Sequence, residues 1–214
     1  GDTIDVPAGD IGVGGREIGY LYGQYKRLTG KYEGVFTGKK LDWGGSLVRT
    51  EATGYGAVYF AQNMLGARGD VAGAGNVAIY TVEKLYQVGA KPVTVSDSNG
   101  MIYDPEGIDL ALLKQVKEEE RARLTRYAEQ RPSAVYTPLE HYPAGRNAVW
   151  SVPCYAAFPS ATQNEVNDED AAELLKNGCK CISEGANMPS SAGAIDKFLA
   201  AGIAYGPGKA ANAG

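Results

Sequence analysis

Residues 71–78 read Val-Ala-Gly-Ala-Gly-Asn-Val-Ala, and a second stretch, Val-Thr-Val-Ser-Asp, follows at residues 93–97. The close pair Gly73 and Gly75 allows backbone N–H groups to approach a pyrophosphate at the start of a helix, where the helix dipole also favours negative charge. Asp97 lies 22 residues beyond Gly75, near the offset of about 20 at which an acidic residue holds a ribose. This pattern predicts dinucleotide binding, and the alternative is a structural glycine turn. The loop residues expected to contact the cofactor are Gly73, Gly75, Asn76 and Val77.

The segment before this loop is shorter than such a motif requires. Only Val71 and Ala72 separate Gly73 from the polar residues 67–70, whereas a strand usually has about 5 to 6 residues. Either the strand that precedes the loop is very short, or residues are missing from the sequence at this point.

Length and charge narrow the class of protein. The chain has 214 residues, which suits one or two domains with a sizeable core. Its net charge is −4 and its pI is about 5.2, which argues against nucleic acid or an anionic membrane as the main partner. No apolar run approaches the roughly 18 residues of a membrane span, and no signal-peptide pattern opens the chain.

The three cysteines and single histidine argue against a disulfide framework and against a metal site. An odd number of cysteines cannot pair completely, and Cys179 and Cys181 lie two apart in a predicted strand, so the reduced thiols of a cytoplasmic protein are expected. A zinc site needs about four ligands. We therefore predict no metal, and we interpret His141 as a surface residue.

Helical and strand-like segments alternate along most of the chain. Apolar residues at 3.6-residue spacing indicate helices, and short apolar runs between turn residues indicate strands. The alternation predicts an α/β fold with a doubly wound, mostly parallel Rossmann-like sheet. Helices are predicted over residues 16–28, 77–88, 109–130 and 192–201, with others beginning at residue 49 and after Asn167, and strands over residues 93–95, 155–158, 179–183 and 203–205.

Polar segments follow the predicted strands. In open α/β sheets, ligands bind beyond the carboxyl ends of the strands. We therefore expect these segments to converge on one edge as a cofactor crevice. They are Asp97 and residues 160–164, 184–187 and 208–212.

Residues 7–14 form a glycine-rich loop in which Asp10 is the only ionisable residue. A carboxylate held in a tight loop beside a cleft can act as a proton shuttle when its surroundings tune its pKa. An aspartate in a surface turn is the alternative, and the residues alone do not decide between them. The chain begins at Gly1 without a methionine, and we read it as a piece of something longer.

Several segments of the sequence resemble the hexameric glutamate dehydrogenases, particularly the NADP-dependent bacterial and fungal type. Together they run almost from end to end of the chain. They are VPAGDIGVGGREIGYLYGQYKRLTG (6–30), GGSLVRTEATGYG (44–56), GNVA (75–78), VTVSDSNG (93–100), YDPEGID (103–109), ATQNE (161–165), EGANMP (184–189) and PGKAANAG (207–214).

The resemblance implies an oxidoreductase that interconverts L-glutamate with 2-oxoglutarate and ammonium, using NADP in a cytoplasmic homohexamer of nitrogen assimilation. It implies that residues 1–48 are the C-terminal part of a substrate domain including the catalytic loop, and that residues 49–214 are a dinucleotide-binding Rossmann-like domain. By position, Asp10 resembles the proton-transfer aspartate. Arg49 and Thr53 resemble residues near the nicotinamide carboxamide, Ser96, Asp97 and Ser98 lie where the adenosine ribose is read, and Ala161, Gln163, Asn164, Asn187 and Asn212 resemble residues lining the nicotinamide and its ribose.

The choice between NADP and NAD depends on the charges around Asp97. An aspartate alone favours the free ribose hydroxyl of NAD, because it repels a 2′-phosphate. In family members that use NADP, the residues at this position nevertheless look like Ser-Asp-Ser. Cations of the next helix are candidates to neutralise the aspartate. We predict NADP, with NAD as the alternative. The candidate cations are Lys117, Arg121 and Arg123.

The sequence departs from the family pattern in several places. The substrate lysines belong upstream of Gly1 and a substrate serine beyond Gly214, and the strand before the glycine loop looks largely deleted. Two rival interpretations therefore stay open: a nucleotide-binding module without turnover, and a relative acting on branched or aromatic amino acids. The other departures are Tyr155 for an aspartate, Ser160 for a cysteine and Gly206 for an alanine.

Overall fold

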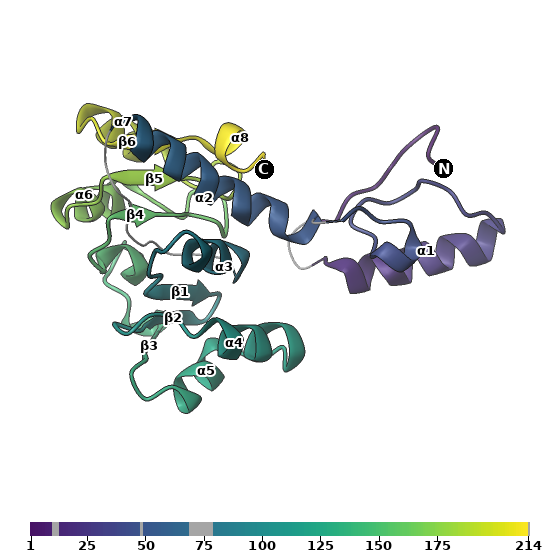
Figure 1. Cartoon of the computed structure of the whole chain (residues 1–214), viewed down its shortest axis with the longest axis horizontal. Coiled ribbons are helices and arrows are strands. Elements are labelled where there is room, and N and C mark those ends of the chain that lie inside the picture. Colours follow the sequence, from purple (N-terminus) through teal and green to yellow (C-terminus); the bar gives the residue numbers. More distant parts are fainter. Residues whose placement is uncertain (10–12, 48, 69–78, 214) are drawn as a thin grey trace. The chain divides into compact units, whose positions relative to one another are not determined.

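The computed structural model describes residues 1–9, 13–47, 49–68 and 79–213, with the backbone alone at residues 49 and 50. The chain divides into two compact units, Gly1–Glu51 and Ala52–Gly214. The helices (Figure 1) are α1 (Gly15–Thr29), α2 (Arg49–Ala67), α3 (Ile79–Gln87), α4 (Leu110–Lys114), α5 (Leu124–Gln130), α6 (Asp168–Lys176), α7 (Ala192–Ala200) and α8 (Gly208–Ala211). The strands are β1 (Thr94–Asp97), β2 (Gly100–Tyr103), β3 (Val135–Pro138), β4 (Ala156–Ala157), β5 (Cys181–Ser183) and β6 (Ala204–Gly206). Short helical turns are η1 (Leu41–Trp43), η2 (Gln115–Glu119), η3 (Leu139–His141) and η4 (Ala148–Ser151).

In the first unit, helix α1 buries one stripe of side chains. Ile18 and Tyr22 lie one turn apart and are both buried, as the amphipathic pattern predicts. Gly30 follows the helix at φ 71°, a left-handed conformation that glycine adopts without steric strain. The ring of Trp43 occupies the space where a Cβ of Gly19 would lie, so helix and η1 pack closely. The helix predicted over residues 16–28 is confirmed.

In the second unit, β4, β5 and β6 form a parallel sheet, with Ala156 opposite Cys181 and Cys181 opposite Ala204. Successive side chains along a strand face opposite sides. Ala156 packs with apolar residues of α2, whereas its neighbour Ala157 packs with those of α6 and α7. Helices therefore cover both faces of this sheet (Figure 1). The parallel arrangement predicted for these strands is confirmed.

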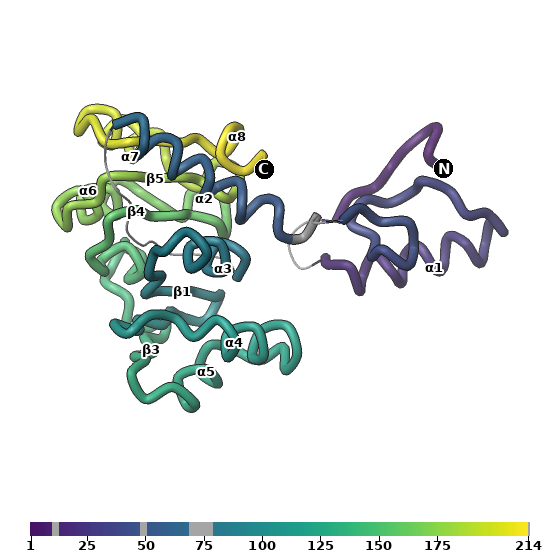
Figure 2. Tube along the Cα trace, in the orientation of Figure 1, coloured from purple at the N-terminus to yellow at the C-terminus, as the bar shows by residue number. Residues whose placement is uncertain are grey.

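Strands β1, β2 and β3 form a second sheet that is antiparallel, with Asp97 opposite Gly100 and Gly100 opposite Pro138. The two residues Ser98 and Asn99 return the chain directly, as only antiparallel neighbours allow. The prediction of a mostly parallel sheet is wrong for these strands. The sequence patterns do not predict the four-residue strand β2, because it lies between the turn residues 98–100 and 104–107. Along the chain it comes before the parallel sheet (Figure 2).

The single helix predicted over residues 109–130 is wrong in its middle, where the chain forms α4, the π-helical turn η2 and α5. Arg121 takes a left-handed φ of 54°, and the next N–H donates to the Val116 carbonyl at 2.8 Å, a closure similar to those that end helices. The Leu124 N–H then donates to the Asp97 carboxylate at 3.2 Å, which starts α5. Of the five residues expected to face inward, Leu110 is partly buried and the other four are buried: Leu113, Val116, Leu124 and Tyr127.

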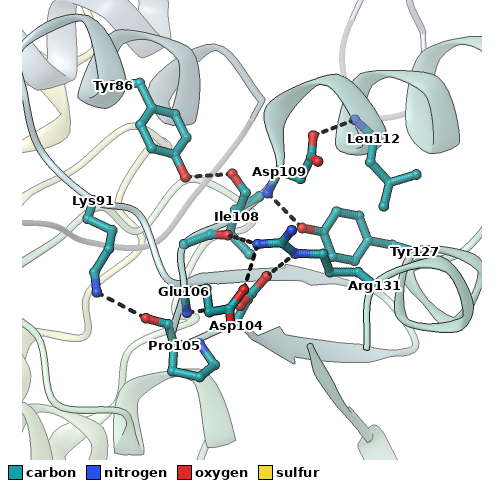
Figure 3. Close-up of polar contacts among 11 residues, drawn as sticks. Tyr86, Lys91, Asp104, Pro105, Glu106, Ile108, Asp109, Leu112, Tyr127 and Arg131 are labelled. Carbon is teal, nitrogen blue, oxygen red and sulfur yellow. Dashed lines mark hydrogen bonds and ion pairs between the residues drawn. The ribbon is translucent and has the colours of Figure 1, made fainter. Parts of the chain in front are cut away.

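A buried ion pair joins the end of α5 to the end of β2. Asp104, which has no exposed surface, accepts a hydrogen bond from Nε of Arg131 at 2.8 Å (Figure 3). The other Asp104 oxygen accepts the Glu106 N–H at 3.0 Å. Beside this pair, the Tyr127 hydroxyl accepts the Asp109 N–H at 2.7 Å, and burial raises the pKa of Tyr127 to about 12.

None of the helices within the described ranges combines the length and apolar character that crossing a bilayer requires.

Candidate functional site

Three loops meet at the carboxyl ends of β4, β5 and β6. The carbonyl oxygen of Pro159, just after β4, accepts the N–H of Gly185 at 2.8 Å and the N–H of Ala186 at 3.1 Å. The N–H of Asn164 donates to the Met188 carbonyl at 3.0 Å. Backbone hydrogen bonds therefore hold together the first two of the predicted segments. The loops are residues 159–164, 184–188 and 207–212.

Glu184 ties the third loop to the other two. It is 2% exposed, and its carboxylate accepts the backbone N–H of Gly208 at 2.8 Å and the hydroxyl of Tyr205 at 3.0 Å. Burial, together with the nearby Glu184 charge, raises the pKa of Tyr205. A buried carboxylate is stable only where donors satisfy it. Glu184 therefore fixes the start of α8 at the edge of the sheet.

Two glycines allow this close approach. A Cβ on Gly185 would lie 1.9 Å from Oγ of Ser160, and a Cβ on Gly208 would lie 2.5 Å from the carbonyl oxygen of Ala186. Both distances are far below van der Waals contact. The backbone loops can therefore reach this proximity only where residues 185 and 208 lack side chains.

Amide side chains cover the outer surface of the three loops. Gln163, Asn164 and Asn187 are exposed, and Nδ2 of Asn212 donates to Oδ1 of Asn187 at 2.9 Å. The remaining donors and acceptors of these amides are available to a polar ligand. The arrangement can bind carboxamide and hydroxyl groups at the carboxyl edge of the parallel sheet.

Glu165 lies directly behind the first loop. Its Oε1 accepts the Ala161 N–H at 2.9 Å, and burial raises its pKa to about 7. The neighbouring charges of Glu184 and Asp170 act in the same direction. The carboxyl that braces the Ala161 backbone therefore changes its protonation state near neutral pH.

A separate polar cluster lies at the end of β1. The sequence predicts that Asp97 converges with the other three segments on one edge, but it ends a strand of the antiparallel sheet, whereas those segments follow the strands of the parallel sheet. One Asp97 oxygen accepts the Asn99 N–H at 2.9 Å, and the other lies 3.2 Å from Nζ of Lys117. Arg123 donates from Nη1 to Oγ of Ser98 at 2.7 Å. Two cations thus accompany one carboxylate, so the cluster of Asp97, Lys117 and Arg123 carries a net positive charge.

The structure brings some of the predicted site residues together and leaves others undescribed. Ala161, Gln163 and Asn164 lie on one loop, beside the loops of Asn187 and Asn212. Ser96, Asp97 and Ser98 lie on the other sheet. Thr53 is a half-buried residue in the first turns of α2, and only the backbone of Arg49 is described. The predicted residues that fall outside the described part are Asp10, Gly73, Gly75, Asn76 and Val77.

Glu184 and Glu165 are the site residues that the sequence patterns do not single out. Both lie within the segments that carry the family resemblance, Glu165 at the end of residues 161–165 and Glu184 at the start of residues 184–189, but no role is predicted for either. In the structure, Glu184 is marked by burial and by the N–H that it accepts from Gly208, 24 residues later. Glu165 is marked by the burial that raises its pKa. Within the described residues, no group of three or more His, Cys, Asp or Glu side chains is placed to hold a metal ion.

The second unit is thus an α/β domain with a polar loop cluster at the carboxyl edge of a parallel sheet, the edge at which such domains bind ligands. A family model described as Glutamate/Leucine/Phenylalanine/Valine dehydrogenase matches residues 44–214. The chain belongs to this family.

Individual relatives agree with that membership. The NADP-specific glutamate dehydrogenase of Helicobacter pylori is 65% identical over 222 residues, covering 100% of this chain and 50% of its own length. The NAD(P)-specific glutamate dehydrogenase of Xylanibacter ruminicola is 52% identical over 225 residues, covering 100% of this chain and 49% of its own length. The chain spans about half the length of the curated relatives it matches.

A solved structure shows the same similarity in three dimensions. The crystal structure of Plasmodium falciparum glutamate dehydrogenase matches with a TM-score of 0.87 and 47% sequence identity, covering 97% of this chain and 45% of that one. The Helicobacter match extends over 222 residues, whereas this chain has 214. The relative therefore has residues in the matched stretch that have no counterpart here.

Proposed function

We propose that the protein to which this chain belongs is an NADP-dependent glutamate dehydrogenase, which converts L-glutamate to 2-oxoglutarate and ammonium and catalyses the reverse amination. Relatives named NADP-specific glutamate dehydrogenase, with 65% and 66% identity over the whole chain, support this assignment. The observation within the chain that carries it is the polar cluster of Asp97, Lys117, Ser98 and Arg123.

This cluster fits the end of a dinucleotide that carries a 2′-phosphate. Asp97 by itself would repel the phosphate, but the Lys117 ammonium lies 3.2 Å from it. The Arg123 guanidinium, which already donates to Ser98, supplies a second cation with several donors. Because the net charge of the cluster is positive, it favours NADP over NAD. NAD remains the alternative cofactor.

The polar loops at the edge of the parallel sheet fit the opposite end of the dinucleotide. We assign Ala161, Gln163 and Asn164, with Asn187 and Asn212, to the nicotinamide and its ribose. When bound, the nicotinamide would supply hydride-transfer chemistry. The amides on these loops orient the ring, and Glu165 and Glu184 hold the loops beneath them. Arg49 and Thr53 are assigned to the carboxamide, and Gly73, Gly75, Asn76 and Val77 to the pyrophosphate.

Asp10 is proposed as the acid–base residue. A carboxylate can carry a proton between the substrate amine and solvent when it is held beside the reacting carbon. This role belongs to a catalytic loop within residues 1–48, the C-terminal part of a substrate domain, while residues 49–214 form a doubly wound Rossmann-like domain. The division of the structure after Glu51 is compatible with such a boundary.

The test uses the full-length protein that carries this segment. NADPH oxidation is followed with 2-oxoglutarate and ammonium, first for the native protein and then for Asp10→Asn. Loss of the proton carrier lowers kcat about a hundredfold or more. Asp5→Asn, which removes another carboxylate from an exposed position five residues earlier in the chain, leaves kcat unchanged. An Asp10→Asn variant with native kcat would overturn the assigned role.

A nucleotide-binding protein without turnover is the second candidate, favoured by the residues that the Helicobacter relative has and this chain lacks. NADPH fluorescence enhancement with no oxidation by 2-oxoglutarate would identify it. A substrate panel that includes branched and aromatic 2-oxo acids tests the remaining alternative, since the family description names leucine, phenylalanine and valine as well as glutamate.

We further propose that the protein is a cytoplasmic homohexamer that serves nitrogen assimilation. The resemblance of the sequence to the hexameric glutamate dehydrogenases supports this proposal. Light scattering of the full-length protein after size-exclusion chromatography tests the assembly, because a hexamer has six times the mass of its chain.

A further inference from the structure

A cleft lies on the side of the second unit where β1 and β4 begin, at the end of these strands away from the candidate functional site. Its volume is about 480 Å³, and it is lined by Val93 and Tyr155, which precede the strands, and by Cys154. Lys91 and Pro105 form part of its wall, where Nζ of Lys91 donates to the Pro105 carbonyl at 3.0 Å (Figure 3).

The register of the parallel sheet places two cysteines opposite one another beside this cleft. Ala156 of β4 is opposite Cys181 of β5, and the Lys180 N–H donates to the Tyr155 carbonyl at 2.8 Å, so the pairing continues toward the strand starts. Two residues earlier on each strand, Cys154 faces Cys179. Neighbouring strands lie about 4.8 Å apart, which is within the Cα separation that a disulfide spans.

The two thiols are in contact and differ in exposure. Cys154 is half-buried and reaches the cleft, whereas Cys179 is 2% exposed. The Cys179 thiol donates to the Cys181 carbonyl oxygen at 3.3 Å and to the Tyr155 carbonyl oxygen at 3.7 Å, and the two thiols shift each other's pKa. The hydrogen bond from Cys154 lowers the pKa of Cys179, and the same contact with burial raises the pKa of Cys154.

The third cysteine has different surroundings. Cys181 has no exposed surface and belongs to the apolar cluster beneath α2. Burial raises its pKa to about 12, and a sulfur with no exposed surface is out of reach of a small disulfide that enters the cleft. The partner of Cys179 is therefore Cys154 on the neighbouring strand, and not Cys181, which lies only two residues away in the sequence.

We propose that Cys154 and Cys179 form a dithiol modification site, at which a small disulfide that enters the cleft is reduced and the two cysteines are joined. This inference is independent of the proposed dehydrogenase function. It assigns a reactive site at the edge of the sheet opposite the candidate cofactor loops.

The reaction is a pair of thiol–disulfide exchanges. In the first, the Cys154 sulfur attacks one sulfur of the small disulfide, a mixed disulfide forms, and one thiol leaves with the proton that Cys154 releases. In the second, the Cys179 sulfur attacks the Cys154 sulfur, and the second thiol leaves with the Cys179 proton. Two cysteine thiols lose two electrons and two protons, and one disulfide becomes two thiols.

The experiment treats the folded chain with oxidised glutathione and then titrates free thiols after denaturation. We expect the titre to fall from the three cysteines of the sequence to one. Trypsin cleaves after Lys180 and so separates Cys179 from Cys181. Mass spectrometry without reduction is then expected to find the peptide containing Cys154 joined to the peptide ending at Lys180.

Three variants assign the two steps. Cys181→Ser, the matched control, keeps the cross-link. Cys179→Ser stops at a glutathione adduct on Cys154, and Cys154→Ser gives neither adduct nor cross-link. A native chain that keeps three free thiols, stops at the Cys154 adduct, or joins Cys179 to Cys181 would overturn the proposal. These outcomes are read on the native chain, so they stand whether or not each variant folds.

Discussion

The Lys117 ammonium lies 3.2 Å from the Asp97 carboxylate at the end of β1, and both side chains are largely shielded from solvent. The pair neutralises the acidic residue that the sequence places at the predicted ribose position. Because Arg123 adds a further cation beside Ser98, the cluster is electrostatically prepared for an anion rather than for a neutral hydroxyl.

Arg123→Ala is expected to weaken NADPH binding selectively. A hydrogen bond to a charged group contributes about 1.5–3 kcal/mol, so KM for NADPH should rise roughly tenfold or more, while KM for NADH changes little. Steady-state kinetics of the full-length protein with both cofactors measure this ratio. Arg126→Ala removes the same charge from α5 at a site paired with Glu120 and Glu129, and equal effects of the two variants would contradict the assignment.

Glu165 is expected to make stability depend on pH between about 5 and 8. Its pKa in the folded chain, about 7, lies above the ordinary value of 4.5, so the folded state holds this proton more tightly. The stabilisation is complete below pH 4.5 and is lost as the pH rises through 7. The shift corresponds to about 3 kcal/mol.

Glu165→Gln should abolish that part of the pH dependence, because the amide carries no titrating proton. Urea unfolding at pH 5 and pH 8 measures it, and the variant should lose less stability than the native chain between the two. Glu169→Gln, at an exposed position in the first turn of α6, serves as the control. The same pH slope in Glu165→Gln and the native chain would exclude the effect.

Arg131→Ala should destabilise the fold more than Asp104→Asn. Removing the arginine leaves the wholly buried Asp104 carboxylate without its cation, and stranding such a charge costs about 3 kcal/mol. The asparagine variant removes the charge and keeps an acceptor for the Glu106 N–H. Chemical denaturation measures the free energy of unfolding of each variant. Lys176→Ala serves as a control, since its pair with Glu173 is exposed on the lysine side. Reversed order would show that the desolvated charge is not the dominant factor.

Gly185→Ala should destabilise the loop cluster, and Ser160→Gly should restore it. The added Cβ would lie 1.9 Å from Oγ and 2.9 Å from Cβ of Ser160, and overpacking of this kind costs about 1–3 kcal/mol. Removing the serine side chain vacates both positions. Thermal unfolding of the single and double variants measures the coupling. A double variant no more stable than Gly185→Ala alone would mean that Ser160 is not the obstacle.

Elements with strong local signals could be predicted from the sequence. The amphipathic stripe of α1 and its terminal Gly30 gave the helix nearly to its ends, and Asn167 caps α6 through the Glu169 and Asp170 N–H groups at 2.9 and 3.0 Å. Asp97 does end a strand, and the loops after β4, β5 and β6 do meet. In each of these cases the deciding contacts are local or follow from parallel pairing.

Features made by distant contacts could not be predicted. The break at Arg121 is completed by Asp97, which accepts the Leu124 N–H from 27 residues away, and an arginine is not a usual helix terminator. In the sequence, Glu184 is an acidic residue at the end of a strand and nothing more. Its structural role depends on the hydrogen bond from the Gly208 N–H, 24 residues later. Strand β2 is visible only from its pairing with β1 and β3, because its own residues lie between two turns.

The three hydrogen bonds to Asp97 have a bearing on how this protein could be altered in the laboratory. The same carboxylate closes a hairpin turn through Asn99, pairs with Lys117 and starts α5 through Leu124. Directed evolution toward another coenzyme would therefore meet a folding penalty at residue 97 itself. Selected libraries should reach the new preference through residues 117 and 123, whose replacement leaves the turn and the helix start intact.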